Sequence, residues 1–101
     1  MEIKVSDEAI AWFKDEVELS EGDTVKFQAK YGGHSPIHEG FSLAFALNEP
    51  SKESIVAREK DGITFFIDET DAWYFKGYNL IVGYDEEKDE VAYEYEEDSS
   101  N

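Results

Sequence analysis

The chain has 101 residues, of which 25 are acidic and 9 are basic, and its formal net charge at pH 7 is −16. This charge repels phosphate backbones and anionic lipids, so we expect neither nucleic acid nor a membrane as a direct partner. The absence of cysteine excludes disulfides, thiol catalysis and thiolate metal ligands, and it favours a cytoplasmic location. Apolar residues make up 41% of the chain and aromatic residues 15%, which is typical of one folded domain.

The first predicted elements are a short strand and an amphipathic helix. The strand covers residues 3–5. Ser6 is placed to cap the helix, because its side-chain oxygen can accept a hydrogen bond from the backbone of the first turn. Apolar residues then recur at helical spacing: Ile10, Phe13 and Val17. We predict that the helix runs for about three turns and stops at Gly22.

Two strands follow, and a polar stretch separates them. The strands cover residues 25–31 and 41–47, where alternation of apolar with polar or small residues predicts burial on one face. The polar stretch, residues 32–40, predicts a loop, and functional side chains concentrate in loops. It begins with Gly32 and Gly33, which indicate a backbone turn with positive φ. A phosphate cradle is disfavoured, because no Lys–Ser/Thr pair follows the two glycines.

The second half of the chain predicts four more strands and one short helix. The strands lie at residues 55–57, 63–67, 80–84 and 91–95. Asp61 and Gly62 indicate a hairpin turn between the first two. Residues 68–75 predict the short helix, which Gly77 closes. Because helices and strands do not alternate as βαβ units, we expect an α+β fold with mainly antiparallel, mixed sheets.

The acidic excess is concentrated at the C-terminal end. Residues 85–101 hold nine acidic residues and one lysine, a net charge of −8, which is half of the total. We predict a single domain over residues 1–95 and an acidic polar tail over residues 96–101. Such acidic runs usually keep a protein soluble, and a docking strip for a basic partner is the alternative.

Several motifs stand in an order that is known from one protein family. After the N-terminal strand and helix, residues 31–35 read Tyr-Gly-Gly-His-Ser, and they are followed by Phe41-Ser42-Leu43, Asp61-Gly62-Ile63 and Lys76-Gly77-Tyr78-Asn79-Leu80. In this order the chain resembles the HesB/IscA-like family of A-type iron–sulfur carriers, and most of all its cysteine-free, YneR-like branch. The resemblance implies a HesB-like domain with curved sheets. Members of that family commonly associate, so a homo-oligomer is one possible state, and the sequence leaves the oligomeric state open.

The chain departs from this family where the carriers hold their cluster or iron. His34 stands at the position of the first family cysteine, and the C-terminal Cys-Gly-Cys of the carriers has no counterpart. Iron–sulfur clusters need thiolate ligands, and even centres with two histidines keep two cysteines. We therefore expect no cluster on one chain. The resemblance then implies a non-enzymatic accessory of iron–sulfur cluster biogenesis or iron homeostasis, and the alternative is a protein-interaction module without metal chemistry.

The polar stretch contains the candidate metal ligands. His34 and His38 are the only histidines, and Glu39 follows the second. Two imidazoles and a carboxylate could hold zinc or ferrous iron weakly if the loop folds them together, and the alternative is that they are ordinary loop residues. Ser35 beside a histidine is a remote candidate nucleophile. No nucleophile-elbow motif or catalytic constellation accompanies it, so we predict a protein that is not an enzyme.

The predicted short helix carries three consecutive aromatic residues, Trp73, Tyr74 and Phe75. Three successive residues of a helix cannot all face the core. Exposed aromatic side chains are favoured anchors at protein interfaces. We therefore name Trp73 and Tyr74 as candidate interaction residues, with a protein as the partner. The alternative is that the chain termini cover them.

Overall fold

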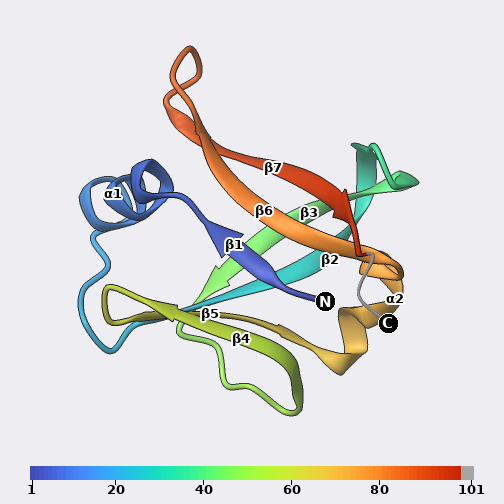
Figure 1. Ribbon diagram of the computed structural model, residues 1–101, viewed down its shortest axis with the longest axis horizontal. Helices are drawn as coiled ribbons and strands as arrows, with labels where there is room; N and C mark the ends of the chain where they lie inside the picture. The colour runs from blue at the N-terminus through green and yellow to red at the C-terminus, as the bar shows by residue number, and fades with distance from the viewer. Residues whose placement is uncertain (99–101) are drawn as a thin grey trace.

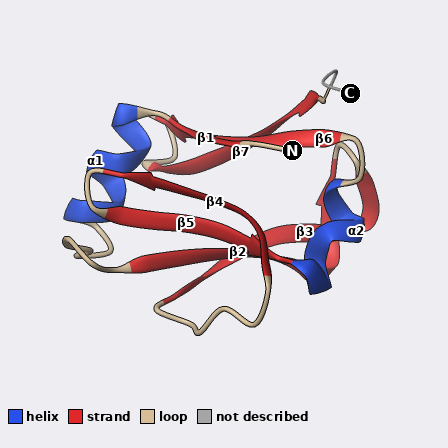
Figure 2. Ribbon diagram, turned by 60° about the horizontal axis from the view of Figure 1, so that its bottom comes forward, coloured by secondary structure: helices blue, strands red, loops and turns tan. Residues whose placement is uncertain are grey.

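The computed structural model describes residues 1–98 and shows a mixed α+β protein with two sheets, which confirms the predicted fold class. The first sheet has the strand order β1 (Ile3–Val5), β6 (Tyr78–Asp85), β7 (Glu90–Glu97). The second has the order β3 (His38–Leu47), β2 (Thr24–Ser35), β5 (Ile63–Asp68), β4 (Ser54–Lys60). The sheets lie face to face, with α1 (Asp7–Asp15) at one end and α2 (Ala72–Phe75) at the other (Figures 1 and 2).

Each sheet combines antiparallel hairpins with one parallel contact. The antiparallel pairs are β2–β3, β4–β5 and β6–β7. The parallel pairs are β1–β6 and β2–β5. In Figure 1 the blue strand β1 lies beside the orange strand β6, and Ile3 is opposite Leu80. Neither sheet can therefore form from local hairpins alone, because a parallel contact joins segments that are distant in the sequence.

An aromatic core connects the helix with both sheets. Phe13 of α1 meets Phe65 of β5 edge-on, with ring centroids 5.4 Å apart, and Phe65 stacks on Phe27 of β2 at 6.1 Å. Phe27 in turn meets Tyr93 of β7 edge-on at 5.9 Å. The three phenylalanines have no exposed surface. Each ring pair contributes roughly 0.5–1.5 kcal/mol beyond the burial of its area, so this series of contacts holds the two layers together.

Helix α1 begins where the sequence predicts and ends earlier. The Ser6 side-chain oxygen accepts a hydrogen bond from the Ala9 amide at 3.1 Å, which confirms the predicted cap. The predicted end at Gly22 is wrong, because α1 stops at Asp15 and the chain then adopts a φ of +58° at Glu18. Glycine is the usual residue in that conformation, so the sequence pattern places the helix end too late. Within residues 1–98 no helix has the length and apolar character needed to cross a membrane.

The predicted loop over residues 32–40 is wrong, because β2 and β3 continue through most of it. A turn at residues 36–37 joins the two strands. Ser35 closes this turn, since its hydroxyl accepts a hydrogen bond from the His38 amide at 3.1 Å and donates one to the His38 carbonyl at 3.3 Å. Gly32 and Gly33, with φ of +102° and +72°, lie at a register shift of the hairpin. The glycines therefore form a β-bulge inside a hairpin and do not begin a loop.

The second half follows the predicted order. Asp61 and Gly62 form the turn between β4 and β5, with φ of +53° and +80°. The predicted helix over residues 68–75 is divided into a 3₁₀ turn, η1 (Glu69–Asp71), and α2. Gly77, with a φ of +85°, lies at the predicted closing position between α2 and β6.

Strand β7 extends past residue 95, where we place the end of the domain from the sequence. It includes Glu96 and Glu97. The Glu96 carboxylate lies 2.9 Å from the Lys4 ammonium of β1, and this ion pair connects the two edge strands of the first sheet across β6. The predicted tail over residues 96–101 thus overlaps β7, and its residues 99–101 lie outside the described residues.

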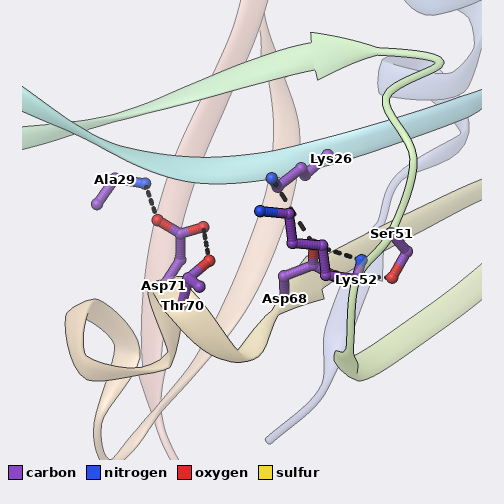
Figure 3. Close-up of polar contacts among 7 residues, drawn as sticks. All are labelled: Lys26, Ala29, Ser51, Lys52, Asp68, Thr70 and Asp71. Atoms are coloured by element: carbon purple, nitrogen blue, oxygen red, sulfur yellow. Dashed lines mark hydrogen bonds and ion pairs between the residues drawn. The ribbon is translucent and has the colours of Figure 1, made fainter.

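Strand β5 ends in a buried carboxylate, Asp68, which is 2% exposed. Its oxygens accept hydrogen bonds from the Ser51 hydroxyl at 2.8 Å and the Lys52 amide at 3.2 Å, and the Lys26 ammonium lies 3.7 Å away (Figure 3). Burial alone would raise the pKa of Asp68, but the two hydrogen bonds and the lysine charge outweigh it, so the pKa of this carboxyl is lowered. The folded protein therefore favours the ionised form of Asp68.

We expect Asp68→Asn to lower the free energy of unfolding by roughly 1–3 kcal/mol at pH 7, because the amide has one acceptor oxygen in place of two and no charge to pair with Lys26. Since folding lowers the pKa, the stabilisation is complete above the unfolded pKa of about 3.9 and is lost as the pH falls through the folded value. The difference between variant and wild type should therefore narrow below about pH 4. Urea denaturation at pH 7 and pH 3 measures this difference in the free energy of unfolding.

The control for this experiment is Glu59→Gln, which changes an exposed acid on β4. It should alter the free energy of unfolding by less than about 0.5 kcal/mol at either pH. A difference between Asp68→Asn and wild type that stayed constant from pH 7 to pH 3 would show that the charge of Asp68 does not stabilise the fold.

Candidate functional site

The site residues predicted from the sequence gather at one end of the molecule, where the β2–β3 hairpin meets α2 (Figure 2). In the hairpin, His34 is opposite Glu39 and Ser35 is opposite His38. Successive side chains of a strand point to opposite faces, so His34 shares a face with Glu39 while His38 points to the other. Within residues 1–98, no three His, Asp or Glu side chains are grouped so that they could hold a metal ion. The structure thus brings His34 and Glu39 together and separates His38 from them.

His38 belongs to a group of aromatic rings. Its imidazole stacks on the Tyr74 ring, with centroids 5.4 Å apart and an interplanar angle of 20°. The Trp73 and Phe41 rings meet the imidazole edge-on at 5.1 and 6.1 Å. Contacts of this kind orient a side chain without needing its charge. In this structure His38 is therefore a packing residue between the hairpin and α2.

Two of the rings in this region are exposed to solvent. Tyr31 of β2 is 86% exposed and Trp73 of α2 is 45% exposed. Phe41 of β3 lies between them and contacts both edge-on, at 5.6 Å from Tyr31 and 5.1 Å from Trp73. With His38, these side chains form a continuous surface of rings. We call Tyr31, His38, Phe41 and Trp73 the aromatic patch.

Tyr74 lies beneath the aromatic patch. Its side chain is 1% exposed, and its hydroxyl is hydrogen-bonded to the Tyr95 hydroxyl at 3.0 Å. Burial, and then the hydrogen bond with Tyr74, raise the pKa of Tyr95 above its ordinary value, so both favour the protonated hydroxyl. Of the two interaction residues named from the sequence, Trp73 has surface to offer a partner. Tyr74 supports the ring of His38 from below.

Asp71 holds α2 against β2. Strand β5 pairs with β2 only over residues 24–26, so beyond that point the amides of β2 that face away from β3 need other partners. The Asp71 carboxylate accepts a hydrogen bond from the Ala29 amide at 3.1 Å and one from the Thr70 hydroxyl at 3.4 Å (Figure 3). Because Asp71 directly precedes α2, this contact places Trp73 beside the hairpin.

Tyr31 and Phe41 are not among the site residues predicted from the sequence. Alternation assigns Tyr31 to the same strand face as Val25 and Phe27, both of which have no exposed surface. Phe27 meets Tyr93 of the opposite sheet, whereas the ring contact of Tyr31 is with Phe41 of its own hairpin, and Tyr31 is 86% exposed. Alternation reports the face of a strand and not what lies above it.

The chain is similar to small bacterial proteins along nearly its whole length. It is 44% identical over 96 residues to the pyruvate dehydrogenase inhibitor of Bacillus subtilis (strain 168), a match that covers 95% of this chain and 100% of that protein. It is 40% identical over 95 residues to an uncharacterised protein of Staphylococcus saprophyticus, covering 92% of this chain and 97% of the relative. The identity to an uncharacterised protein of Staphylococcus aureus (strain MRSA252) is 38% over 96 residues.

No protein-family model matches the chain. The matches to these relatives nevertheless cover more than nine-tenths of this chain. The chain therefore belongs to the same family as the Bacillus subtilis pyruvate dehydrogenase inhibitor and its staphylococcal relatives.

Proposed function

We propose that the protein binds a pyruvate dehydrogenase and lowers the activity of that enzyme by contact, without catalysis of its own. The observation that carries this proposal is the 44% identity, over the full length of the relative, to a protein named as a pyruvate dehydrogenase inhibitor. A regulatory protein of this kind agrees with the interaction module that the sequence suggests as an alternative. It agrees less well with an iron–sulfur accessory.

We assign the contact with the enzyme to the aromatic patch. Tryptophan and tyrosine are enriched among the residues that carry most of the energy of protein interfaces. Phe41 and His38 contact Trp73 edge-on, and Phe41 also contacts Tyr31. Rings that neighbours already orient lose less conformational freedom on binding, which favours affinity. The patch therefore combines exposed area with fixed orientation.

A second candidate function is an accessory role in iron–sulfur cluster biogenesis or iron homeostasis. It is favoured by the resemblance of residues 31–35 to the Gly-Gly-Cys-Ser motif of HesB/IscA-like carriers, and a HesB-like fold remains a prediction from that resemblance. In this candidate, His34 and Glu39 would supply two ligands to iron or zinc from one face of the hairpin. His38 would join them only by leaving its stack on Tyr74.

We expect the purified protein to inhibit the pyruvate dehydrogenase of its own cell in a saturable manner. Trp73→Ala should weaken binding at least about tenfold, because truncation of a central aromatic anchor removes most of its contact energy. The matched control is Ile55→Ala. Ile55 of β4 is 44% exposed, close to the 45% of Trp73, and is not part of the aromatic patch. The rate of pyruvate oxidation and calorimetric titration measure the two effects.

Experiments with the wild-type protein test whether it inhibits the enzyme, and experiments with the variants test whether the aromatic patch makes the contact. No binding and no inhibition at a tenfold molar excess of folded wild-type protein would contradict the proposed function. Equal weakening by Trp73→Ala and Ile55→Ala would contradict the assignment of the contact to the aromatic patch. Thermal unfolding of both variants confirms that each is folded.

For the metal candidate, we expect wild type and His34→Ala to bind Zn²⁺ equally weakly, because two side chains on one face are fewer than the three protein ligands of a zinc site. Calorimetric titration with Zn²⁺, and with Fe²⁺ under anaerobic conditions, measures this. His38→Ala is the control for the second histidine. Tight binding of one metal equivalent by wild type, lost in His34→Ala, would instead support the iron-linked candidate.

A further inference from the structure

A cleft of about 240 Å³ is lined by residues of α1 and of the β6–β7 hairpin. Helix α1 lies at the end of the molecule opposite α2 (Figures 1 and 2). Trp12 of α1 and Tyr84 of β6 form aromatic walls. The remaining polar lining is made of four carboxylates: Glu8, Asp15, Glu16 and Asp89. None of the residues that line the cleft is basic. The cleft thus combines aromatic walls with negative charge.

The two aromatic walls are held in place by Asp89. The Trp12 indole N–H donates a hydrogen bond to the Asp89 carbonyl at 2.9 Å, and the Tyr84 hydroxyl donates one to the Asp89 carboxylate. Trp12 is also packed edge-on against Phe13 at 5.3 Å and Phe45 at 6.2 Å. Both polar ring atoms are therefore already bonded within the protein. What the walls offer to a ligand is their π surface.

No lysine of residues 1–98 forms an ion pair with a carboxylate of the cleft. The only lysine of α1, Lys14, pairs with Asp61 at 3.4 Å, outside the cleft. In the part of the chain that the structure describes, no ion pair involves Glu8, Asp15 or Glu16. Three carboxylates therefore face solvent without a cationic partner, and a cation that entered would meet them together.

The pKa of the Tyr84 hydroxyl reflects the negative electrostatic potential of the cleft. Its hydrogen bond to Asp89, burial, and the charges of Asp89, Glu86 and Glu16 raise the pKa of Tyr84 to about 12. The carboxylates that disfavour deprotonation of Tyr84 would also stabilise a positive charge in the cleft.

We propose that this cleft binds an arginine side chain of a partner protein. A guanidinium is planar and stacks on aromatic rings, and its N–H groups match carboxylate oxygens in pairs, which a lysine ammonium does not. The cleft volume of about 240 Å³ is below the roughly 300–1,000 Å³ of small-molecule sites, so the cleft suits one side chain. That the partner is a pyruvate dehydrogenase rests on the proposed function.

The test is an NMR titration of ¹⁵N-labelled protein with N-acetylarginine amide and with N-acetylcitrulline amide, its neutral isostere. We expect the Trp12 indole N–H and the Tyr84 and Asp89 amides to shift saturably with the arginine probe. Citrulline should bind at least about tenfold more weakly, because hydrogen bonds between two charged groups are lost. The triple variant Glu8→Gln/Asp15→Asn/Glu16→Gln should weaken arginine binding to a similar extent.

The matched control is Glu49→Gln/Glu59→Gln/Glu94→Gln, which removes the same charge from exposed acids outside the cleft lining. It should leave the affinity for arginine within about twofold, since exposed charges at a distance are screened. Equal shifts with citrulline, or equal weakening by the two triple variants, would overturn the proposal. Binding of the arginine probe without inhibition of the enzyme would contradict only the proposed function. Inhibition of the enzyme without binding of the arginine probe would contradict only the assignment of an arginine site to the cleft.

Discussion

The position of α2 depends on two carboxylates at the point where β5 leaves the second sheet. A helix of four residues is too short to be stable by itself, so contacts with the rest of the chain must hold it. Asp68 fixes the end of β5 through buried hydrogen bonds, and Asp71 then takes the place of a strand neighbour at the Ala29 amide. Burial of Tyr74 and Phe75 completes the attachment. The exposed ring of Trp73 is therefore set on a rigid support.

The two ends of the molecule offer a partner different kinds of interaction. At the α2 end, aromatic rings present apolar area, which acts only at contact distance. At the α1 end, uncompensated carboxylates act over about 8 Å at physiological ionic strength and so influence the approach of a basic surface. Electrostatic attraction and short-range packing are thus separated on one small scaffold.

Local chemistry in the sequence is enough to predict those elements that local contacts stabilise. Ser6 caps α1 and Asp61-Gly62 turns between β4 and β5, because each depends on neighbours only a few residues away. The bulge at Gly32 and Gly33 is different. Paired glycines are compatible with a loop or with a bulge, and the choice is made by the pairing of β2 with β3 along their length. The left-handed conformation of Glu18 likewise carries no sequence signal.

The candidate sites are harder to predict because they depend on contacts between distant segments. Treating residues 32–40 as a loop allows His34, His38 and Glu39 to converge, whereas strand alternation divides them between two faces. Trp12 and Asp89 are 77 positions apart, and only the packing of α1 beside the β6–β7 hairpin makes them neighbours. The acidic residues of the cleft, taken alone, have the sequence pattern of a solvated helix face or an acidic turn. The proposed function depends on contact surfaces that only the fold assembles, and it requires no short sequence motif.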